Sequence, residues 1–126
     1  MNGIDRGPDI EGEIRFLSTE DGGRQSAALS GYRPAHKIHD NYLTSGKHVY
    51  PDVEQVRPGE SAKVHVWFVT PHVYPRSLWP GRDLDVMEGS RVVGKLRVVS
   101  VFNDTLEGSP ETYSPRWVPP PGLDQL

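Results

Sequence analysis

Residues 62–69 read Ala-Lys-Val-His-Val-Trp-Phe-Val, and this stretch decides the fold class. Val64, Val66 and Phe68 share one face of an extended chain, while charged, polar or amphipathic side chains occupy the other face. Successive side chains of a strand point to opposite faces, so a period of two residues is typical of a half-buried β-strand. The stretch therefore predicts a strand with one face in a protein core.

The same pattern recurs on both sides of this strand. Residues 10–16 and 84–86 alternate between apolar and polar side chains, and the run 91–102 is rich in valine. In that run the expected inward-facing residues are Val92, Gly94, Leu96, Val98 and Phe102. One further extended run begins at residue 32 and continues to residue 38, and Ser45-Gly46 is expected to break the next.

Turn signals separate these runs, and no convincing amphipathic helix lies between them. The turns are expected at Glu20–Gly23, Arg57–Glu60 and Glu88–Ser90. Six short strands with regular turn signals are typical of a small all-β domain. The sequence alone leaves an antiparallel barrel and a sandwich open.

Glycine and proline distinguish the ends of the chain from its middle. There are 13 Gly and 12 Pro among 126 residues. Residues 1–8 are expected to form a flexible leader, and residues 9–103 the folded domain. Residues 104–126 form a Pro-rich tail that is expected to be extended or disordered, because proline lacks a backbone donor. The alternative is that Trp117 and Val118 dock on a partner or back on the domain.

Composition excludes several classes of protein. The net charge of −3 disfavours broad, non-specific nucleic-acid binding, and the absence of cysteine removes disulfides and thiolate chemistry. No run of about 18 apolar residues exists, so no membrane partner is expected. The polar N-terminus lacks a signal-peptide core, which favours a cytoplasmic location.

A search for catalytic and metal motifs is negative. The sequence contains no phosphate-binding loop, no His-Glu-x-x-His and no Gly-x-Ser-x-Gly. His36 and His39 are three residues apart, so on a strand they point to opposite faces and cannot share a metal. We expect them to be ordinary half-buried histidines. The prediction is a protein that is not an enzyme and that holds no cofactor and no metal.

Several short motifs occur in an order that resembles a known family. They are Glu13–Ser18, Asp21–Arg24, Gly31–Pro34, Thr44–Gly46, Val56–Glu60, Thr70-Pro71 and Glu88–Gly94. In this order they resemble the C-terminal (third) β-barrel domain of bacterial elongation factor Tu, over residues 9–103. The resemblance implies a six-stranded antiparallel Greek-key barrel, in agreement with the strand pattern.

The resemblance also implies a function of docking rather than catalysis. In the family this barrel holds the T-stem side of aminoacyl-tRNA, and the GTPase lies in another domain, so no GTP binding is expected here. Gly23-Arg24 matches a loop that reaches the tRNA backbone, and Glu88-Gly89 matches a loop that faces the T-stem. Arg33 and Arg91 match family arginines, although arginines at such positions also pair with carboxylates and pin turns.

Some positions depart from the family, and these make any RNA binding weak. Gln25 replaces a histidine, Met87 replaces an arginine, and residues 39–41 replace a basic stretch. The first hypothesis is therefore a binding module of translation-factor type that docks a tRNA or other structured RNA weakly.

The alternative hypothesis is a protein–protein interaction module, such as an adaptor, an immunity-type protein or an elongation factor mimic. The negative net charge and the loop 71–80 favour it. That loop offers Tyr74, Arg76 and Trp79, which are residue types enriched in protein-binding hot spots. The competing interpretation is that Tyr74, Leu78 and Trp79 only close one end of the barrel.

Overall fold

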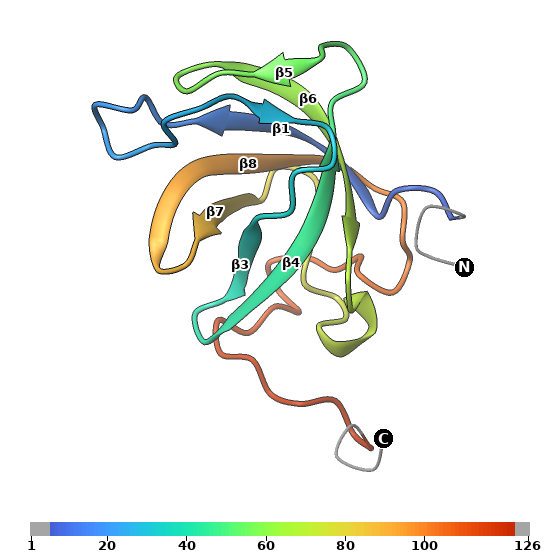
Figure 1. The fold of residues 1–126 in the computed structure, drawn as a ribbon. Helices are drawn as coiled ribbons and strands as arrows, with labels where there is room; N and C mark the ends of the chain where they lie inside the picture. Colours follow the sequence, from blue (N-terminus) through green and yellow to red (C-terminus); the bar gives the residue numbers. More distant parts are fainter. Residues whose placement is uncertain (1–5, 123–126) are drawn as a thin grey trace.

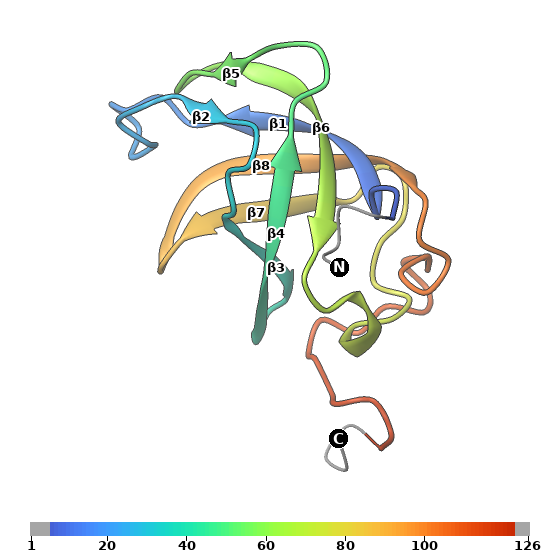
Figure 2. The same ribbon diagram turned by 45° about the vertical axis from the view of Figure 1, so that its right-hand side comes forward.

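The computed structural model describes residues 6–122 and shows an all-β protein (Figure 1). Six strands form a closed antiparallel barrel in the order β1-β6-β4-β3-β7-β8, which confirms the expected fold class. The barrel strands are β1 (Ile10–Phe16), β3 (Ala35–His39), β4 (Tyr42–Val49), β6 (Ser61–Phe68), β7 (Asp83–Glu88) and β8 (Arg91–Val101). A short pair, β2 (Ala28–Leu29) with β5 (Gln55–Val56), lies beside the barrel, and a 3-10 helix η2 spans Pro71–Val73 (Figure 2).

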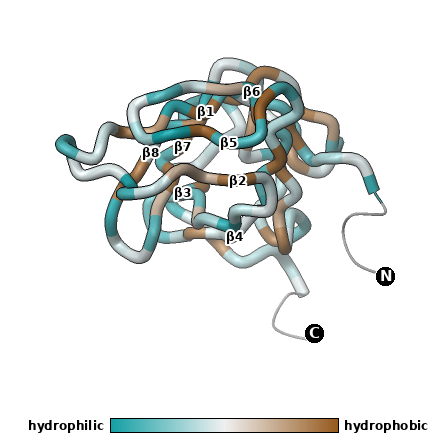
Figure 3. Tube along the Cα trace, turned by 45° about the horizontal axis from the view of Figure 1, so that its top comes forward, coloured by the Kyte–Doolittle hydropathy of each residue, from teal (hydrophilic) through white to brown (hydrophobic). Residues whose placement is uncertain are grey.

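The barrel interior is built by the period-two pattern. In β6 the three apolar residues Val64, Val66 and Phe68 are fully buried, as their alternation predicts. Hydrophobic and hydrophilic residues follow one another along the chain of the barrel strands (Figure 3). The sequence of β6 alone therefore places its side chains correctly.

The prediction for β8 is wrong at two positions. A bulge lies in the β7–β8 ladder, where Val86 pairs with Gly94 but Met87 pairs with Val92. The extra residue, Val93, is buried in place of Val92. Phe102 lies beyond the strand and is 52% exposed. One extra residue shifts the alternation of a strand, and composition does not reveal it.

The expected break at Ser45-Gly46 does not occur, because β4 runs through both residues. Gly46 is instead required by packing inside the barrel. A Cβ atom at this position would lie 2.9 Å from Val66 and 3.0 Å from the His36 ring. A glycine inside a strand often marks such a close approach rather than a turn.

The C-terminal segment packs on the barrel, which corrects the expectation of a disordered tail for residues 104–122. Trp117 Nε1 donates a hydrogen bond of 2.7 Å to the Val73 carbonyl, and the Trp117 ring stacks on Tyr42. The Asn41 side chain holds the backbone of Trp117 through two hydrogen bonds of 2.6 and 3.1 Å. The Trp117 ring and the Asn41 side chain thus attach the segment to the barrel, although its prolines cannot donate backbone hydrogen bonds. Residues 123–126 lie outside the described part.

Only the end of the expected leader is described, since residues 1–5 lie outside the structure's described range. Arg6 pairs with the buried carboxylate of Asp9 and donates a 2.9 Å hydrogen bond to the Phe68 carbonyl. Residues 6–8 are therefore attached to the barrel. Within residues 6–122, no helix is long and apolar enough to cross a membrane.

Candidate binding site at the β7–β8 turn

Candidate residues from three separate segments meet at the β7–β8 turn. The Arg24 guanidinium forms an ion pair with the carboxylate of Glu88, which ends β7. Tyr32 OH donates a hydrogen bond to the same oxygen, Glu88 Oε2. Arg91 Nη2, from the start of β8, lies 3.6 Å from Glu88 Oε1. We call these four residues, Arg24, Tyr32, Glu88 and Arg91, the arginine–glutamate cluster.

Two glycines set the backbone of the cluster. Gly23 is buried, and a Cβ atom there would lie 2.1 Å from the Leu17 carbonyl oxygen, so only glycine fits before Arg24. Gly89 has φ 61° and is the first residue of the two-residue turn between the paired residues Glu88 and Arg91. Such hairpin turns favour glycine at this place. The two glycines therefore determine the backbone positions of Arg24 and Glu88.

The electrostatics keep Glu88 ionised and Tyr32 neutral. Partial burial acts to raise the pKa of Glu88, but hydrogen bonds from Tyr32 and Arg24 outweigh it and leave the pKa below its ordinary value. Burial, together with the hydrogen bond to Glu88, raises the pKa of Tyr32. The Tyr32 hydroxyl therefore remains a donor, and its ring lies 4.3 Å from the Arg24 guanidinium carbon, a cation–π contact.

The arginines differ in how much of their side chain is exposed. The Arg24 side chain is only 17% exposed because Glu88 and Tyr32 cover it, whereas that of Arg91 is 55% exposed. The pairing of Arg91 with a carboxylate is the structural role that its residue type suggests. Arg33 follows Tyr32 and is exposed, and within residues 6–122 it forms no ion pair.

The residues of the loop 71–80 differ in burial. Tyr74 and Leu78 are buried, and the Tyr74 hydroxyl lies 3.1 Å from Thr44 Oγ1 inside the barrel. The expectation that Tyr74 contacts a partner is therefore wrong, and the alternative, that it closes the barrel end, describes it. Trp79 is half-buried between Arg82 and Tyr113.

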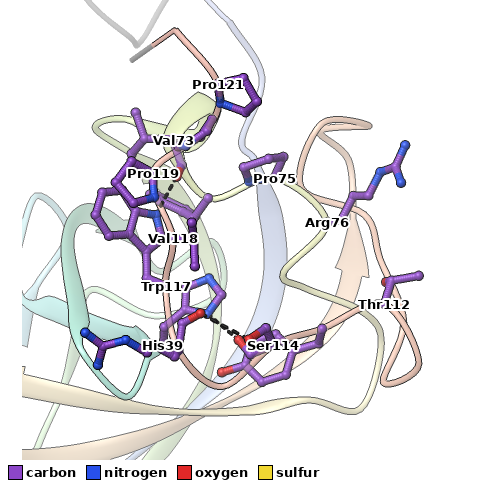
Figure 4. A pocket seen from close by; sticks show the side chains of 14 residues that line it. His39, Val73, Pro75, Arg76, Thr112, Ser114, Trp117, Val118, Pro119 and Pro121 are labelled. Atoms are coloured by element: carbon purple, nitrogen blue, oxygen red, sulfur yellow. Dashed lines mark hydrogen bonds between the residues drawn. The ribbon is translucent and has the colours of Figure 1, made fainter. Parts of the chain in front are cut away.

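Arg76 is the one predicted contact residue of this loop that is exposed. It has φ 56° and borders a cavity of about 320 Å³ between the loop and the C-terminal segment. Figure 4 shows that Trp117, Val118 and the neighbouring prolines line the same cavity.

Two features were missed by the sequence reasoning. Tyr32 belongs to the cluster, and His36 and His48 form a fully buried pair, although His36 was expected to be half-buried. The available signal was periodicity, since His36 is two residues from Ile38 and His48 is two residues from Gly46, all four on inward-facing positions. Among the described residues, no three His, Asp or Glu side chains gather to hold a metal.

No protein-family model matches this chain.

Proposed function

We propose that this protein is a non-enzymatic binding module of translation-factor type that docks a tRNA-like RNA weakly at the arginine–glutamate cluster. One observation supports the proposal most. The resemblance matches Arg24 and Glu88 to two loops on the RNA side, and these residues, 64 positions apart in the sequence, form an ion pair.

The contacts expected with RNA are few and mainly to phosphates. Arg33 and Arg91 have exposed side chains that can approach a phosphate directly. Arg24 is covered, and no lysine belongs to the cluster. Because the salt dependence of binding grows with the number of phosphates neutralised, a shallow dependence is expected.

A titration of tRNA against wild type and the double variant Arg33→Ala/Arg91→Ala tests the proposal. The double variant should bind tRNA more weakly, and the salt dependence of its remaining binding should be shallower. Arg97→Ala is the matched control, because Arg97 is an exposed arginine of the same strand β8 that pairs with Asp83 away from the cluster. Equal binding by all three proteins would refute the proposal.

A second candidate function, protein binding, has an observation of its own. The cavity between Arg76 and the C-terminal segment is flanked by Val118, which is 70% exposed. Exposed apolar and arginine side chains beside a cavity are typical of interface centres. For a protein complex at this place, Val118→Asp should weaken binding and Arg91→Ala should leave it unchanged.

A further inference from the structure

The Glu88 carboxylate is surrounded by donors in the way that a bound anion would be. Oε2 accepts hydrogen bonds from Arg24 and from the Tyr32 hydroxyl, and Oε1 faces the Arg91 guanidinium at 3.6 Å. Two guanidinium groups and a phenol are the donors that carboxylates and phosphates share. The three residues therefore form an anion receptor, and Glu88 is its occupant.

We infer that Glu88 is a built-in competitor of the RNA, and that a backbone phosphate binds the receptor by displacing the Glu88 carboxylate from Arg24. This inference rests on the proposed function and concerns the regulation of the same site.

The receptor is held more firmly than its occupant. Arg24 Nε donates a 3.2 Å hydrogen bond to the Ser26 carbonyl, and its guanidinium carbon lies 4.3 Å from the Tyr32 ring centroid. These contacts remain when Glu88 leaves. Glu88 has no second anchor of this kind among the described residues, since its side-chain oxygens contact only Arg24, Tyr32 and Arg91.

Exposure is consistent with displacement. The Glu88 side chain is 32% exposed and lies at the end of a hairpin, so it can turn into solvent. The Arg24 side chain beneath it is 17% exposed and becomes accessible only when Glu88 moves. An ion pair of this exposure is a weak contact, and a phosphate brings more acceptor oxygens to the same donors.

Removal of the competing charge should strengthen RNA binding. Glu88→Gln keeps the size of the side chain and an acceptor for the Tyr32 hydroxyl, but it removes the charge that holds Arg24. We expect a gain in tRNA affinity of about 2- to 5-fold, the range that exposed ion pairs imply. The salt slope should stay unchanged, because Arg24 contacts the phosphate in both complexes, whereas Arg24→Ala should lower it.

The experiment compares tRNA binding at two salt concentrations for wild type, Glu88→Gln, Arg24→Ala and the double variant. Glu54→Gln is the matched control, because it makes the same change in net charge at an exposed position. The gain must appear in Glu88→Gln, be absent in Glu54→Gln and vanish in the double variant. Circular dichroism checks folding, and Glu88→Ala serves as a second variant with the same expected gain.

The outcomes separate this inference from the proposed function. If wild type binds tRNA and Glu88→Gln binds equally or more weakly, the competitor role is refuted while the function stands. If no variant binds tRNA, the function fails, and inorganic tripolyphosphate becomes the probe. Tripolyphosphate binding by Glu88→Gln that exceeds wild type and requires Arg24 then supports the receptor, and its absence refutes it. If Glu88→Gln gains affinity for polyglutamate but not for tRNA, RNA is refuted as the ligand of the receptor and an acidic protein partner is favoured.

Discussion

The Nε2 atoms of His36 and His48 lie 2.8 Å apart inside the barrel, and both side chains are completely buried. His36 Nδ1 lies 3.1 Å from the Thr44 carbonyl oxygen, which can only accept, so this nitrogen carries a proton. In the neutral ring, His36 Nε2 must then accept the hydrogen bond that His48 Nε2 donates. The Tyr50 hydroxyl, 3.1 Å from His48 Nδ1, completes the chain as a donor. With both imidazoles neutral, every ring nitrogen of the pair has a hydrogen-bond partner.

This pair predicts that the protein loses stability in mild acid. Burial lowers the pKa of His36 from 6.5 to about 4, and burial together with the charge of His36 lowers the pKa of His48 well below 6.5. Below pH 6.5 the two histidines therefore bind protons in the unfolded chain but stay neutral in the folded protein. The free energy of unfolding should fall by up to about 1.4 kcal/mol per pH unit for each histidine. Urea unfolding at several pH values between 7 and 5 measures the loss.

The groups around the pair do not change the sign of this prediction. Tyr32 and Tyr50 face His48, and both phenols are neutral in this range because burial raises their pKa values. The apolar ring of Phe68 faces His36. His72→Gln, a substitution of an exposed histidine, is the control. A flat profile for the wild type between pH 7 and 5 would contradict the burial argument.

The two histidines should also be coupled energetically. His36→Leu leaves the His48 Nε2 donor buried without a partner, which costs about 1–3 kcal/mol beyond the change in packing. His48→Leu likewise leaves the Tyr50 hydroxyl unpaired. The double variant removes the hydrogen bond between the rings altogether, so it should be less destabilised than the sum of the single variants. Equal values for the double variant and the sum would show that the 2.8 Å contact contributes nothing.

The barrel was predictable from sequence to the extent that each strand keeps a strict period of two. β6 does so, and its inward-facing side chains follow from the alternation of Val64, Val66 and Phe68. β8 does not, because the bulge at Val93 is set by pairing with β7 rather than by local preference. Of the candidate site, Arg24 and Glu88 could be proposed from the resemblance. Their contact with Tyr32 depends on tertiary structure, so no spacing rule reveals it.

The same distinction explains why the tail and the buried histidines were misjudged. A proline-rich segment has no ladder of its own, so its order depends on partners such as Asn41, which lies 76 residues away in sequence. His48 faces inward only because β4 continues through Gly46. Local periodicity therefore cannot predict features that depend on contacts between residues distant in sequence.

The protein should not hydrolyse GTP. The sequence contains no phosphate-binding loop, and its two Gly-Lys pairs, Gly46-Lys47 and Gly94-Lys95, lie inside strands β4 and β8 rather than in a loop before a helix. The Lys47 ammonium lies over the Trp67 ring instead, 5.1 Å from its centroid. Purified protein should show no saturable phosphate release. Lys47→Ala is the control, and hydrolysis that is saturable in wild type but lost in this variant would overturn the prediction.

Removal of the C-terminal segment should lower the melting temperature, in contrast to the expectation for a solvated tail. The Trp117 ring stacks on Tyr42 with centroids 4.5 Å apart and packs against the hydrophobic core. Its indole N–H also satisfies the Val73 carbonyl, so truncation exposes apolar surface and leaves an acceptor without its partner. Trp117→Ala should cost about 2 kcal/mol, below the range for a fully buried tryptophan because this side chain is only partly buried. Deletion of residues 110–126 should cost at least as much.

Val118→Ala is the matched control, since Val118 is 70% exposed and its loss should leave the melting temperature unchanged. A truncated protein that melts at the wild-type temperature would show that the segment contributes nothing to folding, and the contacts of Trp117 would then have no energetic consequence.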